Sequence, residues 1–459
     1  MYDFAIVGSG ASGGRVAYDL TAAGARCVLV EAGRAFEAAT FPGRELDYTA
    51  QMFWAGGLEI TSDGRLGLLR GKCLGGGTVV NQALMDRGDD LALDDWRDRS
   101  GVGFFNTRDL APDYEAAEAA LNLTVISEER RGRSARLFIQ ALERKGIRWA
   151  PLRRAEKDCA SAHGSDCLVC LGGCPRDSKQ SALVTTIRWA RERGLAVETE
   201  LEVFEVVDRG DRVAVRGRRH GREVEIEAAK AVLAAGALGT TALLLRSSSL
   251  RASPALGWNF SCHPQFMSYA VFREPVDAHK GTFQSVKSDD PHLRRAGYKL
   301  ENVAAPPAAT ALLIPGLRAE HQDIMKRFRH LACMEVCVRD EPAGRLRLDR
   351  RGRLLIEKPL TDQDRRRCRE GLDLVMELFA LMDPVQVVRC AQPFGLHLMG
   401  GCVLGANPDR SVVDPEFRLH EHRNVYVVDS SLFPSAPGLN PCLTILALSH
   451  RAARNMIGG

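Results

Sequence analysis

Apolar residues in this chain follow two different patterns, and the change between them divides the sequence. Short, continuous apolar runs at 4–7, 27–30, 231–235 and 425–428 are typical of strands buried on both faces of a parallel sheet. From 261 to 388 apolar and polar positions instead alternate, as they do in antiparallel strands. The two patterns predict an α/β domain that is interrupted by an antiparallel sheet.

Further elements follow from the same periodicities. Helical spacing predicts helices within 95–123, at 179–193, at 361–382 and at 442–456. The alternation of 197–216 and 223–227 predicts a small antiparallel ribbon. Strands of the antiparallel region are expected at 265–272, 331–338, 346–348 and 354–357.

The first strand leads into a glycine turn that predicts a dinucleotide site. Gly8, Gly10 and Gly13 follow the strand, and a helical pattern and a second strand, closed by Glu31, come next. The glycines permit a tight turn, a close approach of the backbone to a pyrophosphate, and close packing of helix on strand. The helix N-terminus offers free N–H groups to phosphates, and Glu31 can accept hydrogen bonds from ribose hydroxyls. The turn alone leaves FAD and NAD open.

Charge and hydropathy set the broad class of the protein. The 459 residues carry a net charge of +4, which is close to balance, so no nucleic-acid partner is expected. Met1 directly precedes the first strand, and the most apolar stretch, 228–245, is broken by Gly236 and Gly239. We therefore expect neither a signal peptide nor a transmembrane segment, and a cytoplasmic protein.

Four of the 13 cysteines form a spaced group: Cys159, Cys167, Cys170 and Cys174, with Pro175 after the last. The C-x2-C-x3-C-P part is similar to the ligand run of bacterial ferredoxins. We expect the four thiolates to hold an iron–sulfur cluster, of 3Fe-4S or 4Fe-4S type. A structural zinc site and free thiols are the alternatives.

Four segments carry a further resemblance. They are the N-terminal GSGASG turn with its acid, GKCLGGGTVVN at 71–81, KAVLAAGALGTTALLL at 230–245, and a closing block of HLMGGCVLG, NVYVVDSSLFP and GLNPCLTI. In this order they resemble the glucose–methanol–choline (GMC) flavin oxidoreductases. The closing block is most similar to the cholesterol-oxidase and long-chain-alcohol branch. The chain is short for the family, which implies a trimmed substrate domain, and comparable cysteines occur in only some branches.

The resemblance implies the fold, the cofactor and most of the site. The fold would be α/β, a Rossmann-like FAD-binding domain of the GMC and p-hydroxybenzoate-hydroxylase type with an interleaved antiparallel-sheet substrate domain. The FAD-binding domain would comprise 1–260 and 389–459, with a cysteine-rich insert at about 155–178, and the substrate domain 261–388. The residues expected to bind FAD are Gly8, Gly10, Ala11, Ser12, Gly13, Glu31, Ala32, Gly71, Gly75, Gly76, Thr78, Asn81, Val203, Ala235, Gly236, Asp429, Ser430, Asn440 and Pro441.

His397 and Asn440 are the catalytic candidates, because the resemblance implies that both lie at the flavin face. A neutral histidine can take the hydroxyl proton of an alcohol while a hydride leaves for flavin N5. An asparagine amide can hold the substrate oxygen. Without the resemblance, a structural core histidine would be the simpler interpretation of His397. For Asp429 the alternative to a cofactor contact is a helix or turn cap.

We therefore expect an FAD-dependent enzyme that oxidises an alcohol group of a polyol, sugar-like or cyclic molecule to a carbonyl. Reduced flavin would pass its electrons to oxygen, a redox protein or a quinone, through the cluster if one is bound. Two alternatives stay open: a flavin-containing lyase of the same family without net redox change, and a flavin-binding protein that has lost catalysis.

Overall fold

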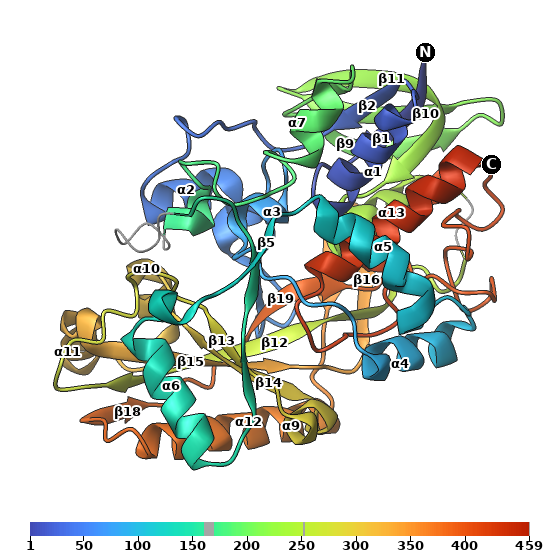
Figure 1. Ribbon diagram of the computed structural model, residues 1–459. Coiled ribbons are helices and arrows are strands. Elements are labelled where there is room, and N and C mark those ends of the chain that lie inside the picture. Colours follow the sequence, from blue (N-terminus) through green and yellow to red (C-terminus); the bar gives the residue numbers. More distant parts are fainter. Residues whose placement is uncertain (160–168, 251–252, 459) are drawn as a thin grey trace.

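The computed structural model describes residues 1–159, 169–250 and 253–458, and it contains two large sheets (Figure 1). The seven-stranded sheet has the order β8-β2-β1-β11-β10-β9, with β20 beside β11. The 11-stranded sheet follows the path β3-β4-β19-β12-β15-β14-β13-β6, with β16, β17 and β18 attached. In Figure 1 the first sheet lies at the top and the second below it. This arrangement confirms the predicted fold class.

The strands have the following bounds. The seven-stranded sheet consists of β1 Tyr2–Val7, β2 Cys27–Val30, β8 Ala196–Glu198, β9 Glu202–Asp208, β10 Val213–Arg219, β11 Arg222–Leu233 and β20 Val425–Val427. The 11-stranded sheet consists of β3 Glu59–Ile60, β4 Gly67–Leu68, β6 Trp149–Pro151, β12 Trp258–Val271, β13 Val286–Ser288, β14 Tyr298–Val303, β15 Leu331–Val338, β16 Gly344–Leu348, β17 Leu354–Glu357, β18 Gln386–Val388 and β19 Phe394–Met399. A separate pair is formed by β5 Leu123–Val125 and β7 Arg153–Ala155.

The helices have the following bounds. The α-helices are α1 Ala11–Ala22, α2 Glu45–Met52, α3 Gly77–Val80, α4 Asp90–Ser100, α5 Thr107–Ala119, α6 Arg133–Arg144, α7 Thr186–Arg191, α8 Gly236–Arg246, α9 Pro291–Ala296, α10 Pro307–Leu313, α11 Arg318–Lys326, α12 Asp362–Ala380 and α13 Cys442–Gly458. The 3-10 turns are η1 Trp54–Gly57, η2 Glu128–Arg130, η4 Val169–Gly172, η5 Phe328–His330 and η6 Ser430–Leu432.

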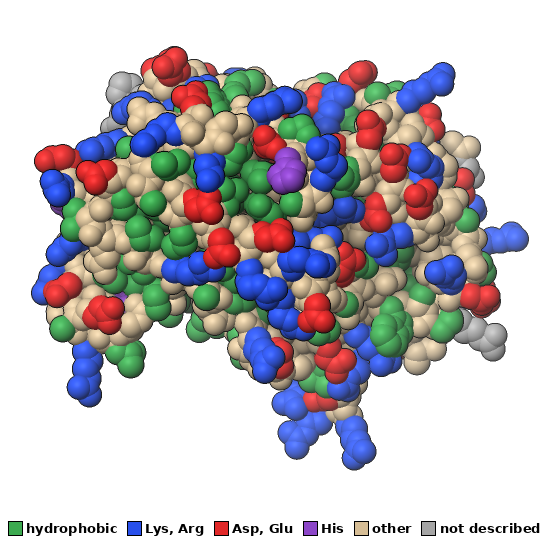
Figure 2. Space-filling view, turned by 90° about the horizontal axis from the view of Figure 1, so that it is seen from below, with side chains coloured by type: hydrophobic (Ala, Val, Ile, Leu, Met, Phe, Trp, Pro, Cys, Tyr) green, Lys and Arg blue, Asp and Glu red, His purple; other side chains and the backbone are tan. Residues whose placement is uncertain are grey.

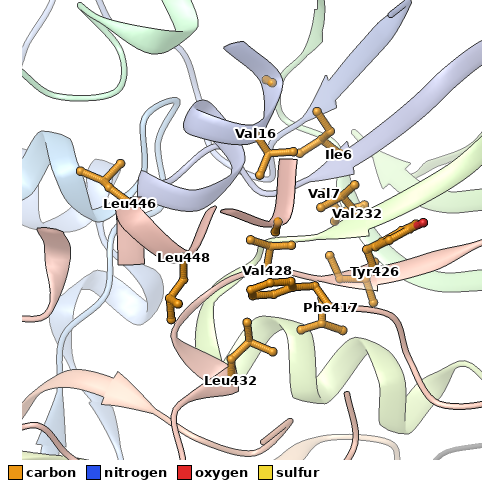
Figure 3. Close-up of a cluster of buried hydrophobic side chains, with 14 of the residues drawn as sticks. Ile6, Val7, Val16, Val232, Phe417, Tyr426, Val428, Leu432, Leu446 and Leu448 are labelled. Carbon is orange, nitrogen blue, oxygen red and sulfur yellow. The ribbon is translucent and has the colours of Figure 1, made fainter. Parts of the chain in front are cut away.

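The core of the first sheet holds the glycine turn in place. Figure 3 shows Ile6 of β1, Val16 of α1 and Val232 of β11 in one buried cluster with Tyr426 and Val428 from the last strand region. Full burial of an aliphatic side chain of this kind contributes about 1.5–3 kcal/mol. The packing fixes β1 against α1, and so fixes the turn between them.

Strand β11 joins two patterns that the sequence separates. Its first half pairs antiparallel with β10, and its second half pairs parallel with β1 and β20. The first half is exposed or half-buried, and the last three residues are buried. The ribbon at 223–227 and the buried run at 231–235 are therefore one strand that changes neighbours.

The second sheet has an apolar face and a polar face. Alternate residues such as Phe266, Leu300 and Val336 pack on helices α6 and α12, and α12 runs below the sheet in Figure 1. The opposite face carries polar side chains on three adjacent strands. We call it the polar sheet face, and its residues are His263, Gln265, Lys299, Glu301 and Glu335, all buried.

Three boundaries differ from the periodicity-based predictions. Helix α4 begins at Asp90, before the expected stretch 95–123, and the Asp89 side chain caps it. Helix α7 covers only Thr186–Arg191 of the expected 179–193. Strands β3, β4, β6 and β19 of the second sheet come from outside 261–388, and the proposed domain division stays a prediction. The expected helix at 361–382 is confirmed as α12, with a capping box at Thr361.

Two surface properties complete the description. None of the helices in the described ranges is both long and apolar enough to cross a bilayer. On the face seen in Figure 2, basic and acidic side chains are interspersed. The mixture agrees with the near balance of 62 basic and 58 acidic residues in the chain.

Candidate active site

The two predicted glycine loops lie against each other at the end of β1. The Ser9 hydroxyl accepts a hydrogen bond from the Gly75 N–H at 2.9 Å and donates one to Glu31 at 2.6 Å. A Cβ atom placed on Gly76 would lie 2.8 Å from the Cα atom of Gly10. The structure thus brings residues of the N-terminal turn and of the loop 71–81 to one place, although they are far apart in the sequence.

The N-terminus of α1 has the features that a pyrophosphate site needs. Gly10 is the N-cap residue, and no side chain caps the helix there. A Cβ atom added to Gly10 would meet nothing within 4 Å, whereas one added to Gly13 would collide with the carbonyl oxygen of Gly8 at 1.8 Å. Gly10 faces open space and Gly13 permits close packing of the helix on the strand, as the dinucleotide motif requires. The residues present therefore fit an FAD pyrophosphate.

Glu31 closes the turn from behind. Its buried carboxylate accepts hydrogen bonds from the N–H and hydroxyl of Ser9 and from the N–H of Gly33. Burial raises the pKa of Glu31, and these hydrogen bonds oppose the rise. A carboxylate has about four acceptor positions, so one is left for a ribose hydroxyl. Val203 lies on β9, just after the Leu201 N–H that donates to the Glu31 carbonyl oxygen.

The loop 71–81 is held by its own Thr78 and by Lys179, which no sequence motif indicated. The Thr78 hydroxyl donates to the Gly75 carbonyl at 2.6 Å and accepts from the Ala182 N–H at 3.0 Å. The buried Lys179 ammonium donates to the carbonyl oxygens of Val79 and Asn81. Lys179 also donates to the Cys170 carbonyl at 2.6 Å, and it thereby ties the cysteine segment to the loop.

Asp429 is a cap, and it also lies beside the N-terminal turn. Its buried carboxylate accepts hydrogen bonds from the Gly236 N–H at 2.9 Å, the Thr240 hydroxyl and the Ser431 N–H. Gly236 begins α8, and the preceding backbone at Ala234 packs directly on Gly8. The alternative interpretation of Asp429 as a cap is therefore observed, and its contact with FAD stays a prediction.

His397 and Asn440 adjoin the polar sheet face. His397 lies on β19, the neighbour of β12, and Asn440 lies just before α13. His397 Nδ1 lies 2.9 Å from His263 Nδ1. The Asn440 amide donates to the Asp86 carboxylate at 3.3 Å, and the Lys287 ammonium holds the other Asp86 oxygen at 2.8 Å. Asp86 thus links one predicted catalytic residue to the lysines of the second sheet.

Ionisation in this region follows from burial and close charges. Burial, reinforced by Lys299, lowers the pKa of His397 to about 3, so this histidine is neutral at neutral pH. Burial raises the pKa of Glu335 to about 8, with Glu301 adding to the rise and Lys299 opposing it. Burial alone would raise the pKa of Asp86, but the two lysines, Lys299 foremost, lower it overall. At neutral pH Asp86 is therefore charged and Glu335 is protonated.

The predicted iron–sulfur ligands are only partly brought together. The thiol of Cys174 donates to Cys170, which lowers the pKa of Cys170, and Lys179 and Arg154 add to this effect. Among the described residues, no three His, Cys, Asp or Glu side chains gather as a metal ion would require. Cys159 is therefore not part of a metal-binding group among the described residues, and Cys167 lies outside them. The cluster stays a prediction.

Several residues of the site belong to no sequence motif that could have identified them. They are His263, Asp86, Lys179, Lys299 and Glu335. The one available signal was local: Ser261, His263 and Gln265 place polar groups at every second position of the stretch 260–267, which is otherwise apolar. Such alternation in a fully buried strand indicates a polar interior face.

Comparisons with known proteins agree with this geometry. Two GMC oxidoreductase family models match the chain, the N-terminal model at 49–265 and the C-terminal model at 341–449. An uncharacterized GMC-type oxidoreductase from Mycobacterium tuberculosis is 29% identical over 98% of this chain and 75% of its own. A long-chain-alcohol oxidase from Arabidopsis thaliana, FAO4B, is 26% identical over 98% of this chain and 66% of its own.

A solved structure shows the same fold. The crystal structure of pyridoxine 4-oxidase from Mesorbium loti superposes with a TM-score of 0.79 at 19% identity, covering 99% of both chains. Family models over 49–265 and 341–449, relatives that match 98% of this chain and a matching fold agree with the site built from the residues. The chain belongs to the GMC oxidoreductase family and is an FAD-dependent oxidoreductase of the alcohol-oxidising class.

Proposed function

We propose that the protein oxidises an alcohol group on a compact, polar molecule, a polyol, sugar-like or cyclic alcohol, to a carbonyl. FAD supplies the hydride acceptor when it is bound between the glycine loops. His397 and Asn440 contact the carbinol oxygen, and the backbone after Pro441, at the start of α13, faces the flavin ring. An alcohol is the expected substrate because the relatives of this family include alcohol oxidases.

The polar sheet face beside His397 and Asn440 supports the choice of a polar substrate. The Lys299 ammonium lies 2.9 Å from the Glu301 carboxylate and 3.8 Å from Asp86, which in turn binds Asn440. The Gln265 and Glu335 Oε1 atoms are buried without a hydrogen-bond partner among the described residues. Each such buried, unpaired atom costs about 1–3 kcal/mol.

A substrate with several hydroxyl groups can satisfy these atoms, and an alkyl chain or sterol body cannot. Gln265 Oε1 is an acceptor, and a protonated Glu335 both donates and accepts. A site built to hydrogen-bond its substrate can reject an analogue that lacks the polar group by about 10⁴–10⁵ in specificity. The polar face therefore favours a polyol over the long-chain alcohol that the Arabidopsis relative is named for.

Anaerobic flavin reduction tests the proposal. The holoenzyme is mixed under nitrogen with a panel of polyols, cyclic alcohols, straight-chain alcohols and a sterol, and the flavin absorbance is followed. We expect bleaching by a polyol or cyclic alcohol at far lower concentrations than by a straight-chain alcohol of equal carbon number. Preferential bleaching by long-chain alcohols would contradict the polar-substrate proposal. No bleaching by any alcohol, together with cleavage of one, would favour the lyase alternative.

A pair of variants tests whether Gln265 contributes to the preference for a polar substrate. Gln265→Leu removes a polar atom from the polar sheet face, whereas Phe266→Leu alters the next residue of the same strand on the opposite, apolar face. We expect only Gln265→Leu to reduce the preference for the polyol. Equal effects of both substitutions would remove Gln265 from the substrate site.

We also propose that Cys159, Cys167, Cys170 and Cys174 hold an iron–sulfur cluster. The support is their spacing and the lowered pKa of Cys170, which accepts a hydrogen bond from the Cys174 thiol and lies near Lys179 and Arg154, since a thiolate is the form that binds metal. Iron and acid-labile sulfide are measured after anaerobic purification. Zinc without sulfide would favour a structural metal site, and neither metal would leave ordinary thiols.

A further inference from the structure

We propose that His263 is a positioning residue that keeps the ring proton of His397 on Nε2, so that His397 meets the substrate oxygen as a hydrogen-bond donor. This inference rests on the proposed function, since it assigns the role of a residue in that site. It differs from the general base that the residue type suggested, and it follows from a chain of two hydrogen bonds.

The first hydrogen bond fixes the tautomer of His263. The Gly438 N–H donates to His263 Nε2 at 2.9 Å. A backbone N–H can only donate, so Nε2 must carry a lone pair. Burial, with further contributions from His397 and nearby cations, holds the pKa of His263 well below its ordinary value, so the ring is neutral. A neutral ring that accepts at Nε2 carries its proton on Nδ1.

The second hydrogen bond passes this constraint to His397. His263 Nδ1 lies 2.9 Å from His397 Nδ1, and the two rings meet edge-on at 83°. Because His263 Nδ1 bears the proton, His397 Nδ1 must accept. The neutral His397 ring then carries its proton on Nε2, and it makes no other hydrogen bond to the described residues.

The backbone around both rings is built to hold this chain. Strands β12 and β19 change register between Ser261 and His263, where three residues of β19 span two of β12, and His397 lies in this bulge at φ 55°. Bulges re-aim side chains next to active sites, and a left-handed backbone at a residue other than glycine is retained only where the surroundings enforce it.

The Gly438 N–H, at the donor end of this hydrogen-bond chain, is also held in place. Arg339 donates to the Ala436 carbonyl oxygen at 2.9 Å, and Arg294 donates to that of Pro437. Both carbonyl groups immediately precede Gly438, so the arginines fix the direction in which its N–H points. The side chain of His263 is 0% exposed, and no water can replace the peptide donor there.

In this arrangement His397 cannot take a proton at Nε2, and protonation of Nδ1 would place two N–H groups against each other. The oxidation moves a hydride from the carbinol carbon to the flavin, and the hydroxyl proton passes to water. His397 keeps its own proton and donates to the carbinol oxygen while negative charge builds there. Donors of this kind are aimed at developing charge and lower the barrier without changing protonation state.

Nuclear magnetic resonance of isotope-labelled histidine in the holoenzyme tests the tautomers without substrate. We expect His397 to show a pyridine-type Nδ1 and a pyrrole-type Nε2, and His263 to show the reverse. The His397→Gln and His263→Gln proteins identify the two sets of signals. A pyrrole-type Nδ1 in His397 would overturn the proposal, even if the enzyme oxidises alcohols as expected.

Single-turnover flavin reduction tests the roles. An amide can donate a hydrogen bond but cannot act as a base, so His397→Gln should reduce its flavin at least tenfold faster than His397→Ala. Loss of one donor of this type costs about 10²–10³ in rate. His263→Gln can still accept from Gly438 and donate to His397, whereas His263→Leu can do neither. We expect His263→Gln to retain a clearly higher rate than His263→Leu.

The control is His420→Gln, because His420 contacts Ser411 in a different region and should leave the rate unchanged. FAD content is measured for each variant, so that misfolded protein is recognised. Equally low rates for His397→Gln and His397→Ala, with full FAD content, would restore the base role and overturn the proposal. If no alcohol reduces the wild-type flavin, the proposed function fails, and the resonance experiment still decides the tautomer.

Discussion

His397 combines features that a histidine packed only for stability does not need. Its backbone is left-handed, it sits in a bulge, and one ring nitrogen is committed to His263 while the other makes no hydrogen bond to the described residues. Burial and Lys299 keep the ring neutral. The motif alone allowed a core histidine, and these surroundings favour a ring that is held for a ligand.

Asn440 should contribute less than His397. Its amide binds Asp86, which is itself held by Lys287, so the amide is held in one orientation. The larger share of the negative charge that develops on the carbinol oxygen is assigned to His397. We predict that Asn440→Ala slows flavin reduction by a smaller factor than the roughly 10²–10³ expected for His397→Ala. Stopped-flow absorbance at saturating substrate measures both. A larger loss in Asn440→Ala would reverse the two roles.

Glu335 should make stability depend on pH. Its pKa is about 8 in the folded protein against an ordinary value of 4.5, chiefly because the carboxyl group is buried. Between these two pH values the folded protein binds the extra proton, so the free energy of unfolding falls as the pH rises. We predict that the fall from pH 5 to pH 8 is smaller in Glu335→Gln, as measured by denaturant unfolding. Identical pH profiles would show that Glu335 ionises normally.

At the scale of elements, the N-terminus of α1 makes the clearest prediction. A methyl group on Gly10 would touch nothing in the protein, and its φ of −64° is open to residues other than glycine. Gly10→Ala should therefore fold with near-normal stability but lose bound FAD, because the methyl group fills the space of the pyrophosphate. The matched control is Gly103→Ala, which also meets nothing within 4 Å and lies on an exposed loop. FAD retention on desalting measures the effect, and full retention in Gly10→Ala would contradict the cofactor assignment.

Periodicity predicted the elements that bury a regular face. Strands β1, β2 and β20 and helices α1, α12 and α13 lie where apolar runs or helical spacing place them. It missed features that depend on partners: β11 continues through two patterns because it changes neighbours, and Lys179 lies outside α7, where it binds the loop 71–81. Neither effect has a local signal.

At the scale of the molecule, the site forms where the polar face of the second sheet meets the loops at the end of the first. Motifs located Gly10 at the first sheet, His397 on β19 of the second sheet and Asn440 before α13, because these residues occur in recognisable local patterns. They could not locate Asp86 or Lys299, which belong to the site only through a three-dimensional contact between distant segments. The sequence therefore predicted the reaction class better than the substrate.

The central claim is that this protein transfers a hydride from an alcohol carbon to its flavin. The most direct measurement compares anaerobic flavin reduction by the best polar alcohol of the panel with reduction by the same alcohol carrying deuterium on the carbinol carbon. We expect complete bleaching in both cases, with clearly slower reduction by the deuterated substrate and formation of one carbonyl product per flavin. Bleaching with equal rates would show that this bond is not broken in the measured step, and carbonyl formation with the flavin still oxidised under nitrogen would contradict hydride transfer to the flavin.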